Sequence, residues 1–189
     1  MGKYQDMLDR AFYGFRRSEV LGLRWSSIDF KNNKIKVEHT AILVGAKTTY
    51  VDDTKTKSSF RTLPLISNVK EYLLKLKEKQ KQDKEIFGDS YQDNDYICKW
   101  VDGRPILPNY VTQKFKEIIT KNDLEPIRFH DLRHSSASLL IQLGFSLKDI
   151  QEWLGHGDVS TTGNIYTHLL FESKIEIGDR LQEQLLIGK

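Results

Sequence analysis

The first part of the chain has the three- and four-residue spacing of apolar positions that is typical of amphipathic helices. Residues 4–13 predict one helix with its apolar positions at Met7, Leu8, Ala11 and Phe12. Gly14 breaks this pattern, and Ser18 is placed to cap a second helix. The apolar positions of that second helix are Val20, Leu21 and Leu23. Arg16 is therefore expected in the break between two helices.

Between residues 28 and 64 the pattern changes to the alternation of apolar and polar positions that predicts β-strands. Asn32 and Asn33 form a turn signal, and residues 41–44 continue as an apolar strand. Residues 51–61 predict a polar hairpin. The expected inward positions are Ile35, Val37, Leu63 and Leu65. This segment therefore predicts a small antiparallel sheet.

Helical spacing returns in the second half of the chain. Residues 67–85 predict a long helix with a charged, solvated end. A loop at 88–94, a short strand at 96–98 and a turn at Asp102 and Gly103 should follow. Pro108 opens the next helix, which is expected to run to residue 120.

The last third predicts short helices with recognisable ends. A helix at 130–143 should end at Gly144, and Ser146 with Asp149 predicts a capping box for a helix at 147–154. Another short helix should carry Tyr166, and residues 172–187 form an amphipathic tail. We therefore expect an α+β, mostly helical fold with a small antiparallel sheet, in a single domain that spans residues 1–189.

Composition narrows the functional classes. Hydrophobic residues make up 39% and charged residues 29% of the chain, which is typical of a globular protein. The net charge of +3 is too small to indicate nucleic-acid binding by itself. Cys98 is the single cysteine, so an internal disulfide and a cysteine-based zinc site are excluded. Neither a membrane-length apolar run nor a signal peptide is apparent, so we expect a cytoplasmic protein.

Residues 128–170 bring together groups that suit phosphate chemistry. Four of the five histidines lie there, and His130 and Arg133 have a spacing that places them on one face of a helix. His156 follows in a Leu-Gly-His-Gly turn, and Tyr166 comes ten residues later. Arginine binds phosphate, imidazole transfers protons, and a phenol can act as a nucleophile. The combination favours phosphoryl transfer to a tyrosine.

These motifs resemble the catalytic domain of tyrosine recombinases, the phage-integrase family. The matching residues are His130-x-x-Arg133, Leu154-Gly155-His156, Tyr166 within NIYTHL, Arg16 with Glu19 in RRSEVLGLRW, and Lys55 in TKTKSSFRTLPL. The resemblance extends from about residue 4 to residue 185. Lys57 is the alternative to Lys55 as the family's lysine.

The resemblance implies a mechanism for site-specific DNA recombination or integration. Tyr166 would attack a DNA phosphodiester, leaving a 3′-phosphotyrosine and a free 5′-hydroxyl, and the 5′-hydroxyl of a second DNA end would rejoin the strand. Neither a cofactor nor a metal ion is required, because the energy of the broken phosphodiester bond is kept in the phosphotyrosine ester. The implied supporting roles fall to Arg16 and Arg133 at the phosphate, His130 and His156 as hydrogen-bond donors or bases, Lys55 as the acid, and Glu19 as support.

The same resemblance implies double-stranded DNA as the main partner. Basic residues expected on the DNA-facing surface are Arg17, Arg24, Lys57 and Arg61. The full-length protein is expected to form a tetramer on DNA, with accessory DNA-bending or directionality proteins and without a membrane partner. The tail could pack on its own domain or on a neighbouring protomer. These expectations place the protein in a bacterial cytoplasm, associated with the nucleoid when bound to DNA.

Two other functions remain open from the sequence. A non-catalytic DNA-binding module could keep the same fold, and a type IB topoisomerase would share the nicking and closing chemistry. The family's N-terminal core-binding domain is absent from these 189 residues, so the chain is expected to represent the catalytic domain.

Overall fold

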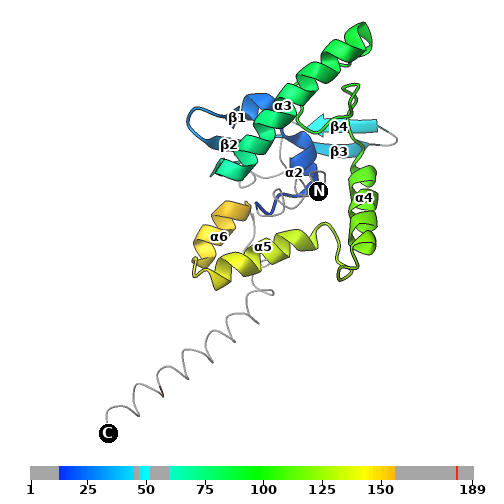
Figure 1. Cartoon of the computed structure of the whole chain (residues 1–189). Helices are drawn as coiled ribbons and strands as arrows, with labels where there is room; N and C mark the ends of the chain where they lie inside the picture. Colours follow the sequence, from blue (N-terminus) through cyan, green and yellow to red (C-terminus); the bar gives the residue numbers. More distant parts are fainter. Residues whose placement is uncertain (1–12, 45–46, 52–59, 156–181, 183–189) are drawn as a thin grey trace.

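A computed structural model describes residues 13–44, 47–51, 60–155 and 182 of the protein (Figure 1). Helices and 3₁₀ turns make up about half of this part of the chain. The α-helices are α2 (Arg17–Gly22), α3 (Ser67–Phe87), α4 (Pro108–Lys121), α5 (Asp131–Gln142) and α6 (Leu147–Leu154). The 3₁₀ turns are η1 (Trp25–Ser27) and η3 (Gly88–Ser90). Among the described residues, no helix combines the length and apolar character that crossing a bilayer requires.

Two small antiparallel sheets lie among these helices. The strands are β1 (Ile28–Asp29), β2 (Lys34–Val37), β3 (Thr40–Val44), β4 (Lys47–Val51) and β5 (Arg61–Pro64). One sheet has the order β1-β2-β5, and the other pairs β3 with β4. In the first sheet Ile35 stands opposite both Ile28 and Leu63, so apolar residues occupy the same face of all three strands.

The turn between β1 and β2 was predicted correctly, whereas nearly all of the hairpin predicted at residues 51–61 lies outside the described residues. The side chain of Asp29 accepts hydrogen bonds from the backbone N–H groups of Lys31 and Asn32, and Asn33 has a positive φ of 51°. By contrast, β4 pairs with β3 while β5 pairs with β2, so the strands that flank residues 52–59 belong to different sheets. Residues 52–59 lie outside the described part of the chain.

The main core forms where α2, α3 and the three-stranded sheet meet. Its buried members include Phe15, Val20, Leu21, Ile35, Val37, Leu63, Leu65, Val69 and Leu73. A smaller core of Ala137, Ile150 and Leu154 joins α5 to α6, which lie side by side in Figure 1. Trp153 packs against both cores, so the end of α6 is attached to the main body of the domain.

Several predicted boundaries shift by one or two residues. The helix predicted from Ser18 begins at Arg17, with Arg16 at its N-cap position, and α3 extends to Phe87. In the second half of α3, which was predicted to be solvated, Gln80 is buried, with 9% of its surface exposed. Its side chain accepts a hydrogen bond from the Trp25 indole and donates one to the Ile97 carbonyl. The strand predicted at residues 96–98 is reduced to an isolated bridge between Arg24 and Tyr96.

The helix ends in the last third follow the predicted signals. α5 starts one residue later than expected, with His130 at its N-cap, and Gly144 follows it with a φ of 84°. Ser146 and Asp149 form the predicted capping box of α6, and Gly155 ends that helix in the left-handed conformation. The helix predicted at residues 4–13 falls almost wholly outside the described residues, as do the helix with Tyr166 and the tail.

Candidate active site

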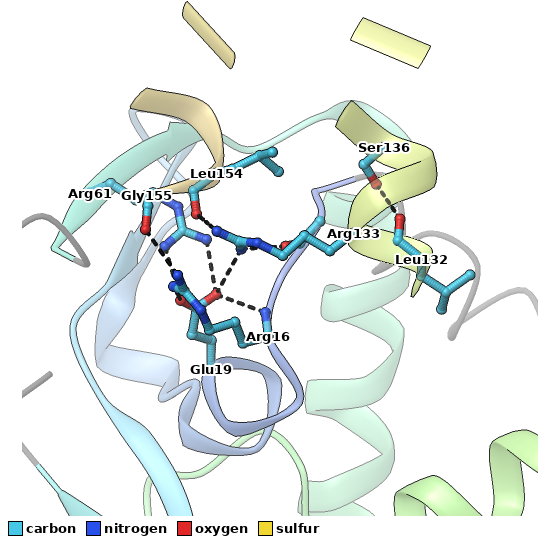
Figure 2. A network of polar contacts seen from close by, with 9 residues as sticks. Arg16, Glu19, Arg61, Leu132, Arg133, Ser136, Leu154 and Gly155 are labelled. Atoms are coloured by element: carbon cyan, nitrogen blue, oxygen red, sulfur yellow. Dashed lines mark hydrogen bonds and ion pairs between the residues drawn. The ribbon is translucent and has the colours of Figure 1, made fainter. Parts of the chain in front are cut away.

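Glu19 in α2 is the centre of a buried polar network (Figure 2). Its side chain is 1% exposed and accepts a hydrogen bond of 2.9 Å from the backbone N–H of Arg16, which begins the helix. A carboxylate at the third helical position satisfies one of the free N–H groups at a helix start. The contact with the Arg16 backbone therefore positions Glu19 within α2, independently of residues that are distant in the sequence.

Three guanidinium groups converge on this carboxylate from three different elements. Arg16 Nη1 donates to Glu19 Oε1 over 2.8 Å. Arg61, at the start of β5, donates from Nη1 to Oε1 over 3.2 Å and from Nη2 to Oε2 over 3.0 Å. Arg133 of α5 places its Nη1 at 3.9 Å from Oε2. Figure 2 shows the three side chains pointing toward Glu19 from separate segments.

Arg16 and Arg133 also bind the end of α6. Arg133 Nη2 donates to the Leu154 carbonyl, and Arg16 Nη2 donates to the Gly155 carbonyl over 3.2 Å. Arg133 Nη1 donates to the Gly14 carbonyl over 2.7 Å. The last carbonyls of a helix are acceptors without intrahelical partners and carry partial negative charge, so guanidinium groups satisfy them well. The two arginines are thus fixed to the residues that immediately precede His156.

The network carries a formal excess of positive charge. Burial raises the pKa of the Glu19 carboxyl, but the hydrogen bonds and charges of Arg61 and Arg16 outweigh burial and hold that pKa below its usual value. Glu19 is therefore ionised at neutral pH. Arginine stays protonated at any working pH, so three guanidiniums and one carboxylate leave a formal charge of +2. This excess suits the binding of an anion such as a phosphate group.

A cleft of about 640 Å³ opens next to this network. Arg16, Arg17, Arg128 and His130 contribute polar or charged groups to its walls. The Arg16 side chain is 34% exposed, so it joins the buried network to the cleft. The cleft gives a charged substrate direct access to one of the two arginines that the sequence identified.

His130 stands at the cleft wall beside His134. The two rings are perpendicular, with their centroids 5.2 Å apart. Partial burial lowers the pKa of His130, and the positive charges of His134, Arg133 and Arg16 lower it further, although Asp131 acts in the opposite direction. The imidazole is therefore mainly neutral at pH 7 and can accept a proton.

Comparison with known proteins identifies the family. The sequence model of the phage integrase family matches residues 11–173 of this chain. The chain belongs to the phage integrase family. Among curated members, the ICEBs1 integrase of Bacillus subtilis is 32% identical over 185 residues, which cover 95% of this chain and 50% of that protein. A XerC-like tyrosine recombinase of Caldanaerobacter subterraneus is 29% identical over 90% of this chain and 46% of its own length.

The fold is similar to that of a solved phage integrase family structure. The Tn1549 transposon integrase in complex with transposon right end DNA has a TM-score of 0.76 and 22% identity, covering 94% of this chain and 58% of that one. The predicted tyrosine-recombinase fold is therefore confirmed. The chain spans about half the length of the curated family members that it matches.

Within this phage integrase fold, the structure brings together four of the predicted catalytic and supporting residues. Arg16, Glu19 and Arg133 share the buried network, and His130 lies at the neighbouring cleft. The other predicted catalytic residues, Lys55, His156 and Tyr166, lie outside the described residues, as does Lys57. For these, the structure leaves the sequence prediction as it stands.

The residues predicted to face DNA have different surroundings. Arg17 lines the cleft and donates to Thr112 Oγ1 over 2.6 Å. Arg24 donates to the Tyr96 hydroxyl over 2.9 Å, with its guanidinium over the Tyr96 ring. Arg61 points inward instead, with a side chain that is 6% exposed. A signal for this orientation was present, because Arg61 is in phase with the inward-facing Leu63 of the same strand.

Arg128 is a cleft residue that the sequence prediction did not single out. Its backbone N–H donates to Asp131 Oδ2 over 2.8 Å, and its Nη2 donates to Oδ1 over 2.9 Å. These hydrogen bonds lower the pKa of Asp131 to about 2. The spacing of an arginine three residues before an aspartate at a helix start was the available signal. The pair holds the segment that leads into His130.

Proposed function

We propose that this protein is the catalytic part of a site-specific tyrosine recombinase, which cleaves and rejoins double-stranded DNA through a 3′-phosphotyrosine intermediate. The single observation that carries the proposal is the convergence of Arg16 and Arg133 on Glu19 beside the cleft that holds His130. Membership of the phage integrase family supports the same reaction. The ICEBs1 and Tn1549 integrases among the similar proteins further support a role in the movement of a mobile element.

The arginines would act on the phosphate that is cleaved. Attack on a phosphodiester builds negative charge on the two non-bridging oxygens in the transition state. Guanidiniums can give paired N–H donors to these oxygens and keep their charge throughout. Glu19 and the Gly155 carbonyl already hold Arg16 beside the cleft, so its guanidinium needs little reorganisation when DNA binds. Arg133 is 2% exposed and bonded to the Gly14 and Leu154 carbonyls, so it would have to redirect N–H donors from these carbonyls to reach the phosphate.

His130, His156 and Lys55 would handle the protons. A neutral His130 can take the proton of the Tyr166 hydroxyl as that oxygen attacks phosphorus, and His156 can donate a hydrogen bond to the phosphate or act as the base itself. Lys55, with Lys57 as the alternative, would give a proton to the 5′-oxygen that leaves. In the second half of the reaction a 5′-hydroxyl attacks the phosphotyrosine, and the Tyr166 oxygen leaves.

The wider assembly follows from this reaction. We place residues 1–189 in one catalytic domain, which meets double-stranded DNA through the basic cleft, with Arg17 and Arg24 as further phosphate contacts. Exchange of strands between two DNA sites requires self-association, with the tail at 172–187 packed in cis or docked on a neighbouring protomer. The reaction belongs in a bacterial cytoplasm, where the chromosome and mobile elements lie.

A nicked suicide substrate tests this proposal. A duplex library with a randomised centre and a nick close to the centre would release a short fragment on cleavage, so that rejoining is blocked and the covalent complex accumulates. We expect DNA that stays attached to the protein after denaturation, in excess chelator and without nucleotide. DNA that is bound but never covalently attached would instead identify a DNA-binding module, and strict dependence on Mg²⁺ would indicate another mechanism.

A further inference from the structure

We propose that Arg61 is a positioning residue of the cleavage site, which orients Glu19 and through it Arg16 and Arg133, and that it does not contact DNA. This inference rests on the proposed function, because it assigns a role in the same site. The sequence alone places Arg61 among surface residues that would bind DNA phosphates. Its burial and its partners in the structure indicate the internal role.

The contact between Arg61 and Glu19 has the geometry of a paired interaction. Each terminal nitrogen of Arg61 meets a different oxygen of Glu19, at 3.2 and 3.0 Å. The two side chains are 6% and 1% exposed, respectively. A bidentate pair of this kind fixes the plane of the carboxylate as well as its position. Arg61 thus restricts rotation of the Glu19 carboxylate.

The Arg61 guanidinium is itself held by an aromatic stack. It lies over the Phe15 ring, 5.5 Å from the ring centroid. Phe15 stacks on Tyr13 with centroids 5.0 Å apart, and Tyr13 stacks on Trp153 at 5.8 Å. The stack joins β5 to α6, whose last carbonyls accept from Arg16 and Arg133. Lysine could keep a cation over the Phe15 ring, but bidentate pairing with Glu19 requires the planar guanidinium, so lysine cannot replace Arg61 fully.

The charge balance explains why a third arginine is useful. The charged groups that face Glu19 in the described residues are Arg16 at the start of α2, Arg61 of β5 and Arg133 of α5. Without Arg61, the single carboxylate would be shared by the two arginines proposed to bind the phosphate. Arg61 takes up much of that negative charge, so Glu19 can orient Arg16 and Arg133 while both keep their attraction for phosphate oxygens.

The test compares Arg61→Gln, Arg61→Lys and a matched control in cleavage of a suicide substrate selected with the unchanged protein. Arg104→Gln is the control, because the Arg104 side chain is 64% exposed and pairs with Asp102 away from the network. We expect Arg61→Gln to cleave about 10- to 100-fold more slowly, as when an outer partner that orients a functional ligand is removed. DNA affinity should stay close to that of the unchanged protein, and Arg104→Gln should change neither quantity.

The pH profile separates positioning from a general loss of structure. Removal of Arg61 removes one of the groups that lower the pKa of Glu19, so Glu19 gains its proton at a higher pH. The Glu19 carboxyl, followed by carbon NMR of the carboxyl group, should therefore titrate at higher pH in Arg61→Gln, and less so in Arg61→Lys, which keeps the charge. In a Glu19→Gln background, Arg61→Gln should cause no comparable further loss of cleavage rate. If Arg61→Gln does not fold, Arg61→Lys carries the comparison.

Several results would overturn the inference. An unmoved titration of Glu19, or effects of Glu19→Gln and Arg61→Gln that simply multiply, would leave Arg61 with a role in the fold alone. A loss of cleavage fully explained by weaker DNA binding would return Arg61 to the DNA-contacting surface. Absence of a covalent adduct with the unchanged protein would contradict the proposed function, whereas an adduct with normal profiles for both Arg61 variants would contradict this inference alone.

Discussion

Arg133 donates a hydrogen bond of 2.7 Å to the Gly14 carbonyl, which joins α5 to the segment immediately before α2. Gly14 has a positive φ of 62°, a backbone conformation that glycine adopts readily and residues with a side chain rarely adopt. This conformation directs the Gly14 carbonyl toward Arg133. One glycine therefore helps to set the position of both predicted catalytic arginines, because Arg16 follows it by two residues.

Substitution of Gly14 by alanine should destabilise the protein more than the same change at Gly144. An added methyl group at Gly14 would meet the Leu154 side chain and lie 3.3 Å from Ser136 Cβ. At Gly144, where φ is 84°, the described residues place no heavy atom within 4 Å of that methyl group. We expect a cost of about 1–2 kcal/mol for Gly144→Ala from backbone strain. Gly14→Ala should cost a further ~1–3 kcal/mol from overpacking, as measured by urea denaturation. Equal costs would show that the contact with α6 is unimportant.

Replacement of Arg133 by lysine should abolish most cleavage while preserving DNA affinity. Lysine keeps the charge but lacks the planar fork that reaches two acceptors. We expect a loss of ~3 kcal/mol or more of transition-state stabilisation, comparable with removal of an oxyanion donor. Folding should also weaken by about 1–3 kcal/mol for each carbonyl that loses its donor, at Gly14 or Leu154. Single-turnover cleavage and filter binding would measure the first two quantities, and urea denaturation the third.

Arg104→Lys provides the comparison for that experiment, because its side chain is largely exposed. It should leave cleavage, DNA affinity and the free energy of unfolding nearly unchanged. If cleavage by Arg133→Lys fell only in proportion to DNA binding, Arg133 would be a phosphate anchor without a special role in the transition state.

His130 should titrate below the usual histidine pKa of about 6.5. Burial is the largest cause, followed by the charges of His134, Arg133 and Arg16. His134→Gln removes one of these charges, so His130 should gain its proton at a higher pH in that variant than in the unchanged protein. NMR titration of the imidazole signals would measure both values. An identical pKa in the two proteins would leave burial and the arginines as the only causes.

The sequence predicted best those features that depend on neighbouring residues. The ends of α5 and α6 were recognisable from Gly144 and from the Ser146–Asp149 capping box, because each signal lies within a few residues of the end that it sets. The period-two pattern likewise identified the inward positions Ile35 and Leu63. These signals rest on local backbone geometry and on side-chain periodicity, both of which can be seen along a single stretch of chain.

Strand pairing and the direction of Arg61 depend on distant residues, and the sequence left both of them open. The apolar pattern located strands but could not show that β4 pairs with β3 and β5 with β2. Arg61 was in phase with Leu63, yet burial of its charge is favourable only because Glu19 lies opposite. Glu19 was predicted as a support for Arg16 or for a neighbouring histidine, whereas its contacts with two further arginines became apparent only in three dimensions.

The central claim is that Tyr166 forms a covalent bond to DNA. The substitution Tyr166→Phe removes only the hydroxyl group, so the fold and DNA affinity of the variant should change little. Tyr110→Phe is the matched control, since Tyr110 lies on α4 and packs against Trp100. Both variants should melt at nearly the same temperature as the unchanged protein, which would exclude misfolding as a cause of lost activity.

The most direct measurement is the yield of covalent protein–DNA adduct on a nicked suicide substrate, followed by mass spectrometry of the peptide that carries the nucleotide. The account predicts an adduct on the peptide with Tyr166, its loss in Tyr166→Phe and its full retention in Tyr110→Phe. An undiminished yield in Tyr166→Phe, or an adduct mapped to a different residue, would contradict it.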